Sequence, residues 1–438
     1  MLDLRFDQLR DRFGWMLGAL VIAGTVVALI VAYRSGRPPR IVTLSALTMT
    51  LVLGGLLIAP AAPRLIRALH QLATASPPTG PSGPLLVETV SVSLPPAMGE
   101  GPPIIAQIWY PAAGDGAASA SDLTLNNVAE IDCAAVMRDA RLSAAERSYP
   151  ILLSAQSGSG LNHDKASTSA ELASHGYVVF AVDDADYEFR PFNSQDGEEA
   201  PPRWNFDFSS AEAFKATLRN ADLKVHRLAE KTLKALDRLD ACANAEWREK
   251  LRFDQVGFFG FSIAGATAAE AGVLDPRVAA VANLDGWLFG RAATGALDKP
   301  YLILNSDAPL PGPRQLQSLD VNERYEATLT DRDWREEVRL MNLPDGYGYW
   351  IYGASHVNFS DGVFDRGSYK YWLLADPFRI KSIADAYLLA FFDKYLRNMN
   401  SPLLRQTPSP YKEVAVLHGN AHWLAGEIGR SLRSLLGW

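Results

Sequence analysis

Five short runs of almost uninterrupted apolar residues set the pattern of this chain beyond residue 150. They are Ile151–Ala155, Tyr177–Val182, Val256–Phe259, Val278–Asn283 and Tyr301–Asn305. Strands buried on both faces of a parallel sheet have this pattern, because helices cover both sides of the sheet. Stretches with helical periodicity separate the runs, at Lys165–His175, Ala211–Leu239 and Ser262–Ala271. This alternation predicts an open α/β sheet with helices on both faces.

Different patterns flank this core. Leu86–Leu94 and Ile104–Tyr110 alternate apolar and polar residues, as half-buried strands do, and the glycines and prolines between them favour a hairpin. Ile383–Leu396 has the pattern of an amphipathic helix. The sequence holds neither a G-x-G-x-x-G pattern nor a P-loop, so it gives no sign of a phosphate-binding loop.

Charge and cysteine content exclude several function classes. The chain has 438 residues, with 42 Lys and Arg against 49 Asp and Glu, and its net charge is −7. A nucleic-acid-binding surface is therefore not expected. Its two cysteines, Cys133 and Cys242, allow one bridge but no metal cluster of their own. Neither a metal nor a cofactor is expected, because no His, Asp or Glu spacing resembles a ligand set.

The first 73 residues are far more apolar than the rest. Phe13–Tyr33 and Ile41–Pro63 carry no charged residue. A helix over the first of these runs spans roughly 30 Å, the thickness of the hydrocarbon core of a bilayer. The alternative is a signal peptide followed by a buried helix. We predict a multi-pass membrane protein with a two-helix hairpin over residues 1–73, a Pro/Gly/Ser linker over 74–85 and an α/β domain over 86–438.

The arginines near these runs leave the orientation open. The ends of a two-span hairpin lie on one side of the membrane and its loop lies on the other. The end side carries Arg5, Arg10, Arg12, Arg64 and Arg67, and the loop carries Arg34, Arg37 and Arg40. The positive-inside rule favours the cytoplasm for the side with more arginines, whereas the denser charge of the loop favours the reverse.

The stretch Val256–Ala266 gives the strongest indication of chemistry. An apolar run leads into Gly260-Phe261-Ser262-Ile263-Ala264 and then into an Ala-rich helical stretch. A serine on such a strand–turn–helix junction projects its hydroxyl above the sheet, and the positions two residues away on either side must be small. Ala264 stands where the usual G-x-S-x-G pattern has its second glycine. The alternative role for Ser262 is a helix N-cap.

A nucleophilic serine needs a base and a group that orients the base. In α/β-hydrolases the chain order is serine, acid, histidine. Of the histidines after Ser262, we expect His356 to be the base, because it follows a strand that breaks into a loop at Gly353. Asp285 and Asp307 each lie at the end of a predicted strand, and spacing alone does not choose between them.

An oxyanion hole needs two backbone amides near the serine. We expect the amide of Ile263 and that of Gly158, or of its neighbour Ser159, to supply them. We expect five aromatic residues to line either an apolar acyl pocket or the core: Trp287, Phe289, Tyr347, Tyr349 and Trp350.

Together these stretches resemble the platelet-activating-factor acetylhydrolase family of α/β-hydrolases, over roughly residues 86–397. The matching stretches are Ile108–Pro111, Pro150–Leu153, Ala173–Phe180, Asp285-Gly286-Trp287, Asn305–Asp307, His356-Val357-Asn358-Phe359 and Phe391–Leu396. Two departures are Ala264 in the elbow and Gln156-Ser157 in place of the family's His-Gly.

The resemblance implies an α/β-hydrolase fold and a Ser262–His356–Asp285 triad, and so selects Asp285 over Asp307. It also implies calcium-independent hydrolysis of short or oxidised acyl groups at the sn-2 position of phospholipids. The expected partners are a lipid or small ester substrate and the membrane. Two alternatives are a carboxylesterase acting on other small or polymeric esters, and a catalytically silent hydrolase-fold scaffold tethered to the membrane.

Overall fold

A computed structural model of the chain describes residues 80–96, 103–113, 133, 140–155, 165–182, 206–364 and 375–418. The chain divides into two units, Met1–Ala75 and Ser76–Trp438, and every described residue belongs to the second. The two predicted membrane spans and Gly158 lie outside the described residues. Within those residues, no helix is both long enough and apolar enough to cross a bilayer.

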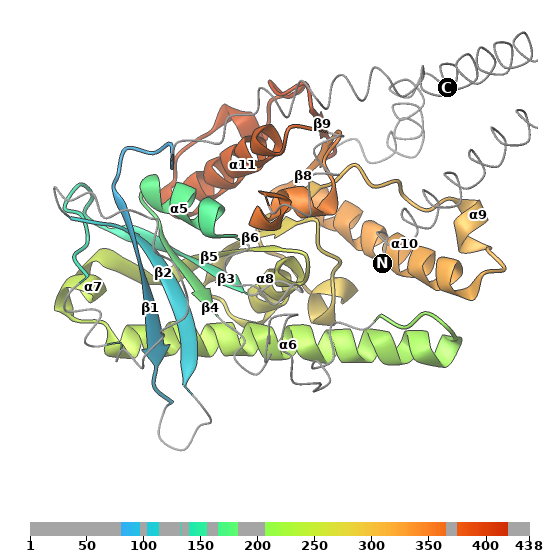
Figure 1. The fold of residues 1–438 in the computed structure, drawn as a ribbon, viewed down its shortest axis with the longest axis horizontal. Helices are drawn as coiled ribbons and strands as arrows, with labels where there is room; N and C mark the ends of the chain where they lie inside the picture. The colour runs from blue at the N-terminus through green and yellow to red at the C-terminus, as the bar shows by residue number, and fades with distance from the viewer. Residues whose placement is uncertain are drawn as a thin grey trace, which may run out of the picture. The chain divides into compact units, whose positions relative to one another are not determined.

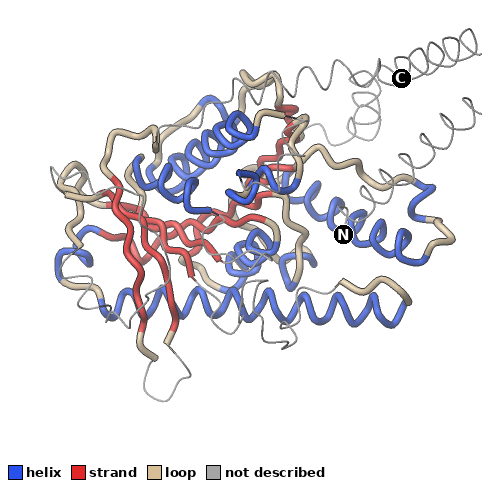
Figure 2. The backbone as a smooth tube through the Cα atoms, in the orientation of Figure 1, coloured by secondary structure: helices blue, strands red, loops and turns tan. Residues whose placement is uncertain are grey.

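The described residues form one mixed sheet of nine strands in the order β1-β2-β4-β3-β5-β6-β7-β8-β9 (Figures 1 and 2). Neighbouring strands from β4 to β8 in this order run parallel, whereas β1, β2 and β9 join antiparallel. The strands are β1 Val87–Leu94, β2 Ile104–Pro111, β3 Tyr149–Ala155, β4 Val178–Val182, β5 Leu251–Phe261, β6 Val278–Leu284, β7 Tyr301–Asn305, β8 Gly346–Ile351 and β9 Val414–Val416. The five apolar runs correspond to β3 to β7, and the predicted hairpin is the antiparallel pair of β1 and β2.

Helices cover both faces of this sheet (Figure 1). They are α5 Ala166–Ser174, α6 Ala211–Cys242, α7 Ala245–Lys250, α8 Ile263–Leu274, α9 Pro313–Leu316, α10 Val321–Met341 and α11 Pro377–Arg397. Buried residues of α5 and α11 pack in one apolar cluster, and those of α6, α7, α8 and α10 pack in another. The arrangement is consistent with the α/β-hydrolase fold.

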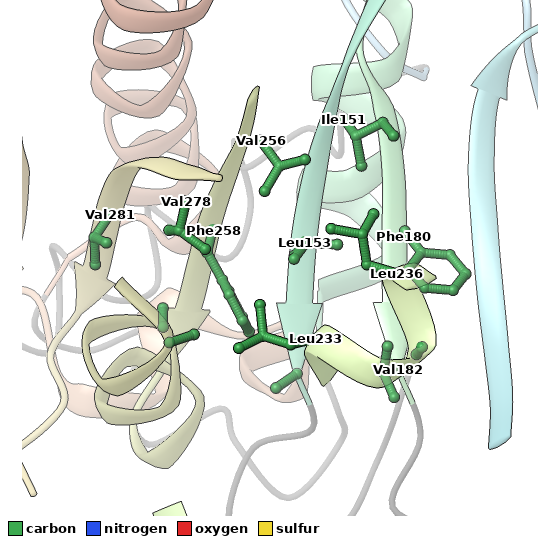
Figure 3. Close-up of a cluster of buried hydrophobic side chains, with 14 of the residues drawn as sticks. Ile151, Leu153, Phe180, Val182, Leu233, Leu236, Val256, Phe258, Val278 and Val281 are labelled. Carbon is green, nitrogen blue, oxygen red and sulfur yellow. The ribbon is translucent and has the colours of Figure 1, made fainter. Parts of the chain in front are cut away.

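Alternation along the strands explains the two clusters. Ile151 and Leu153 of β3 belong to the cluster under α6, whereas Leu152 between them belongs to the cluster under α11. Successive side chains of a strand point to opposite faces, so a continuous apolar run fills both layers. Figure 3 shows the α6 side, where Leu233 and Leu236 lie among the side chains of the central strands.

A disulfide ties two parts of the α6 layer together. Cys133 is bonded to Cys242 at the end of α6, with 6.1 Å between their Cα atoms. Cys133 is fully buried in the cluster under α6, and Cys242 packs against that cluster. The bridge that the sequence allowed is therefore present, and it closes a loop of 109 residues.

Candidate active site

Ser262 lies on the sharp turn between β5 and α8. Its backbone has φ 58° and ψ −125°, in the left-handed region that non-glycine residues rarely adopt. A backbone strained in this way costs on the order of 1–3 kcal/mol and persists only where its surroundings hold it. The Ser262 N–H donates to the carbonyl of Leu284 at the end of β6, over 2.9 Å. The turn therefore has the geometry expected of a nucleophile elbow.

The small residues around Ser262 are required by this turn. A Cβ atom on Gly260 would lie 2.2 Å from backbone atoms of Ala264, and one on Gly286 would lie 2.0 Å from the carbonyl oxygen of Ser262. Ala264 itself is buried at the start of α8. The turn thus excludes a side chain at 260 and accepts the alanine at 264, so the departure from G-x-S-x-G leaves the elbow intact.

Asp285 and His356 meet at the carboxyl edge of the sheet. Nδ1 of His356 lies 2.7 Å from Oδ2 of Asp285. The other oxygen, Oδ1, accepts the backbone N–H of Ser306 over 2.6 Å. An ionised carboxylate only accepts, so a hydrogen bond at this contact needs a proton on Nδ1, and Nε2 is then the nitrogen free to accept. This contact is the arrangement of an acid that orients a base.

Asp307, the alternative acid, has a different role. Its Oδ1 accepts the indole N–H of Trp350 over 3.0 Å, and its Oδ2 accepts the N–H of Gly353 over 2.9 Å. Its own N–H donates to the carbonyl of Ala354. Asp307 therefore fixes the end of β8 and the start of the following loop, whereas Asp285 is the carboxylate in contact with His356.

His356 begins a 3₁₀ turn, His356–Phe359, and is less buried than Asp285. Its side chain is 50% exposed, whereas that of Asp285 is 14% exposed. The turn is closed by Asn358, whose Oδ1 accepts both the N–H and the hydroxyl of Ser355 over 2.7 Å. Asn358 is buried, which explains the polar residue in the His-x-Asn-Phe stretch.

Phe261 connects the turn that carries Ser262 to the turn that carries His356. Its ring centroid lies 4.5 Å from that of His356, and it directly precedes Ser262. Nζ of Lys165, at the start of α5, lies 4.9 Å from the same ring centroid. A cation near the face of an aromatic ring is attracted by the ring quadrupole. Phe261 thus brings α5, the elbow and the base turn into contact.

A buried carboxylate joins the base turn to α5. Asp361, five residues after His356, accepts the N–H of Ser167 over 2.8 Å and also the Ser167 hydroxyl. Burial raises the pKa of Asp361, and the charges of Lys381 and Lys165 oppose that rise. Ser167 lies in the first turn of α5, where N–H groups lack partners within the helix. Asp361 therefore ties the loop after the base to the beginning of that helix.

The remaining described histidines have structural partners. His175 contacts Glu171 and Ser82, and His226 contacts the fully buried Glu270 over 3.0 Å. Burial lowers the pKa of His418, and its Nδ1 accepts from the N–H of Gly348. Among the residues that the structure describes, no cluster of His, Cys, Asp and Glu has the arrangement of a metal site.

Most aromatic candidates for an acyl pocket belong to the core. Phe289, Tyr347 and Tyr349 are fully buried, and Trp350 is nearly so. Trp287 is the partly exposed one and contacts Phe206 in a T-shaped arrangement, with ring centroids 5.4 Å apart. These rings belong to a small cluster that also includes Ile263, the residue after the serine. Of the five candidates, Trp287 alone has exposed surface beside the elbow to offer a substrate.

Comparison with known proteins leaves the family open. No protein-family model matches the chain, and no curated protein matches it. Among solved structures, the chain is similar to a ferulic acid esterase from Streptomyces cinnamoneus, with 21% identity, a TM-score of 0.48, and coverage of 77% of this chain and 98% of that one. A likeness this distant carries no inference about activity.

Proposed function

We propose that this chain is a serine carboxylesterase that uses Ser262 as nucleophile, His356 as base and Asp285 to orient the base. The observation that carries the proposal is the 2.7 Å contact between His356 and Asp285, beside a serine held at a positive φ. A helix N-cap needs no such backbone, and the Ser262 side chain accepts no capping hydrogen bond from α8.

The first half of the reaction transfers the acyl group to the enzyme. Nε2 of His356 takes the proton of the Ser262 hydroxyl while the serine oxygen attacks the ester carbonyl. The carbonyl oxygen becomes an oxyanion, for which the N–H of Ile263 and the N-terminus of α8 provide stabilisation. His356 then gives its proton to the departing alcohol, leaving an acyl-enzyme. Asp285 stabilises the imidazolium and does not itself take the proton.

The second half returns the enzyme to its starting state. His356 takes a proton from water, and the resulting hydroxide attacks the acyl carbon. The second tetrahedral species collapses when His356 returns that proton to the Ser262 oxygen, which releases a carboxylic acid. The second oxyanion donor expected from the sequence, the amide of Gly158, completes the proposed site.

The site indicates the general class of substrate. An ester of modest size fits the proposed chemistry, and Trp287 provides an aromatic surface beside the elbow. The narrower proposal, a phospholipid with an sn-2 acetyl or oxidised acyl group, is supported by the resemblance of the His356-Val-Asn-Phe359 and Asp285-Gly-Trp287 stretches. The carboxylesterase proposal does not require it.

One experiment tests both levels. The purified full chain is treated with a fluorophosphonate probe and assayed with nitrophenyl esters graded by acyl length, beside an sn-2 acetyl phospholipid. We expect labelling and turnover that both vanish in Ser262→Ala and persist in the control Ser91→Ala on the edge strand β1. Turnover that survives in Ser262→Ala contradicts the esterase proposal. Turnover of nitrophenyl esters without turnover of the phospholipid contradicts only the narrower substrate.

The N-terminal region is the basis for a proposed location of the protein at a membrane. We propose that residues 1–73 form a membrane hairpin that tethers the esterase domain through the linker at 74–85. Two uncharged runs of bilayer length support this proposal. Retention of the chain in the membrane fraction after alkaline carbonate extraction, and its release when residues 1–73 are deleted, is the expected result.

A further inference from the structure

A row of aromatic rings begins at the turn after Asp285 and extends to the first turns of α6 and α10. The centroids of neighbouring rings lie between 4.7 and 6.1 Å apart. Both helices begin on the same side of the domain, where the last two rings of the row stack (Figure 1). In order, the rings of this aromatic row are Trp287, Phe206, Phe208, Phe214 and Tyr325.

The first ring of the aromatic row adjoins the nucleophile. Trp287 follows Asp285 by two residues, and Gly286 between them packs against the elbow so closely that a Cβ atom there would lie 2.0 Å from the Ser262 carbonyl oxygen. Ile263, which directly follows the serine, is buried in the apolar cluster on which all five rings pack. A substituent of an ester bound at Ser262 therefore has the Trp287 end of the row within reach.

Most of the aromatic row keeps exposed surface. Phe208 is buried, but the other four rings, Trp287, Phe206, Phe214 and Tyr325, are only partly buried. Single exposed apolar residues are common on proteins and need no explanation. A connected series of partly exposed rings that starts beside a catalytic serine is different, because binding sites for small molecules are lined mainly by apolar and aromatic side chains.

The second and third rings are held in place by α6. Thr217 is 4% exposed, and its hydroxyl group accepts the N–H of Asp207 over 3.0 Å and donates to the Asp207 carbonyl over 3.1 Å. Asp207 lies between Phe206 and Phe208, so both polar groups of the backbone that joins these rings are bonded to the helix. A surface fixed before the ligand arrives loses less conformational entropy on binding.

The turn that carries the first ring is held by three helices. Its backbone bonds are Leu288 N–H to Asp333 Oδ1 (2.5 Å), Gly290 N–H to Asp222 Oδ1 (2.8 Å) and Ala292 N–H to Glu270 Oε2 (3.1 Å). The acids come from α10, α6 and α8 respectively. Asp333 also forms a buried carboxyl pair with Glu337, one turn further along α10. Trp287 is thus on backbone as constrained as that of Phe206.

The ring contacts favour an aromatic ligand over an aliphatic one. Trp287 meets Phe206 edge to face, with 83° between the ring planes, and Phe214 stacks on Tyr325 with 21° between them. Rings in these two arrangements attract each other by more than their buried area alone accounts for, because the quadrupoles of the rings are complementary. A planar aromatic group can extend such a series, whereas a saturated group of the same size gains only from burial.

We propose that the aromatic row binds an aromatic ring of the substrate, so that the preferred substrates are esters with such a ring close to the reacting carbonyl. This inference deepens the proposed esterase function and rests on it. An sn-2 acetyl phospholipid has no aromatic ring, so the inference favours the broader carboxylesterase proposal over the phospholipid.

The test compares esters that differ only in whether a ring is aromatic. One pair is methyl phenylacetate and methyl cyclohexylacetate, and the other is benzyl acetate and cyclohexylmethyl acetate. The acid released by the purified full chain is titrated at constant pH, and each ratio of kcat/KM is divided by the ratio of the rates with hydroxide alone. We expect an aromatic preference of about tenfold in at least one pair, which also identifies the half of the ester that contacts the row.

Variants assign this preference to the row. Trp287→Leu replaces the ring by an apolar side chain and should reduce the preference to less than about threefold, whereas Trp287→Phe should keep most of it. Phe206→Leu should have a smaller effect in the same direction. The matched control is Tyr411→Leu, because Tyr411 is also partly buried and meets the ring of Tyr387 edge to face, but in the layer under α11. It should keep the full preference.

The ratio separates recognition from a structural role. Loss of packing alone lowers turnover of both members of a pair by one factor and leaves their ratio unchanged. Absence of an aromatic preference in both pairs, or a preference that survives in Trp287→Leu and Phe206→Leu, overturns the proposal. If Trp287→Leu does not fold, Phe206→Leu decides. Failure of the esterase function itself is recognised separately, by turnover that persists in Ser262→Ala.

Discussion

The turn that carries Asp285 and the turn that carries His356 meet at one hydrogen bond, yet they are built differently. Asp285 has a φ of 56°, is mostly buried, and is followed by backbone that three helices hold. His356 is half-exposed on a short 3₁₀ turn that Asn358 closes locally. The comparison indicates that Asp285 has a fixed position and that the half-exposed ring of His356 takes its orientation from the contact with Asp285.

Removal of the base tests one side of this comparison and has the largest expected effect. His356→Ala should lower kcat by about 10⁴-fold or more, because Ser262 loses its proton acceptor. Stability should change by only about 0.5 kcal/mol, since the side chain is half-exposed. Nitrophenyl ester turnover and urea unfolding measure the two quantities. A large fall in the unfolding midpoint would show that the base turn supports the fold.

Replacement of the two aspartates distinguishes the acid from its neighbour. Asp285→Asn should lower kcat by about 10⁴-fold, because the amide no longer stabilises the imidazolium or selects its tautomer. Asp307→Asn should change kcat less than about tenfold but destabilise the fold by about 1–2 kcal/mol, through its bonds to Trp350 and Gly353. The same assays compare the variants. Equal losses of activity would contradict the separation of roles.

The rigidity of the elbow is tested by exchanging its small residues. Gly260→Ala introduces a Cβ atom 2.2 Å from the backbone of Ala264, and we expect it to destabilise the fold by about 3 kcal/mol and to lower activity. Ala264→Gly, the matched change on the other side of Ser262, should destabilise it by less than about 1 kcal/mol. Urea midpoints provide the measurement. A well-tolerated Gly260→Ala would mean that the elbow is less constrained than its geometry indicates.

The pH dependence of stability gives the smallest expected effect. Asp333 keeps its proton in the folded state up to a pKa of about 7, whereas an unfolded aspartate releases it near the ordinary value of 3.8. Its contribution to the free energy of unfolding is therefore complete below that ordinary value and is lost as the pH rises toward 7. Between about pH 5 and about pH 7 the wild type should lose more stability than Asp333→Asn. Parallel curves for the two proteins would contradict the buried protonated pair.

Most of the sheet was predictable because its strands are continuous apolar runs. The predicted limits of the third to seventh strands agree with the structure to within a few residues, except at β5, which starts five residues earlier, at Leu251. Of the residues Leu251–Gln255 only Leu251 is buried, so this part of the strand lacks the continuous apolar signal.

Helix α10 was not predicted from the sequence, for a physical reason. Buried positions on this helix include Asp333 and Glu337, so acids interrupt the stripe that normally identifies an amphipathic helix. A usable signal was present at its beginning. Asp320 accepts the N–H groups of Asn322 and Glu323, and an Asp N-cap followed by an acid in the first turn is a recognised helix start. The same acids explain why the carboxyl pair behind the site was missed.

The parts of the site that depend on residues close together in the chain could be predicted from the sequence. The strand–turn–helix junction predicted the backbone at Ser262, and the end of β8 predicted the turn with His356. The choice of Asp285 over Asp307 depends on which strand end faces that turn, a long-range property that spacing does not contain. The resemblance selected Asp285, and in the structure this residue contacts His356.

The bridge between Cys133 and Cys242 has a practical consequence for handling the protein. It closes a covalent ring that contains β3, β4 and the whole of α6, while Ser262, Asp285 and His356 follow outside the ring. A single proteolytic nick between the two cysteines therefore yields a two-chain molecule. It migrates as one species on a denaturing gel without reductant and separates into two fragments when the bond is reduced.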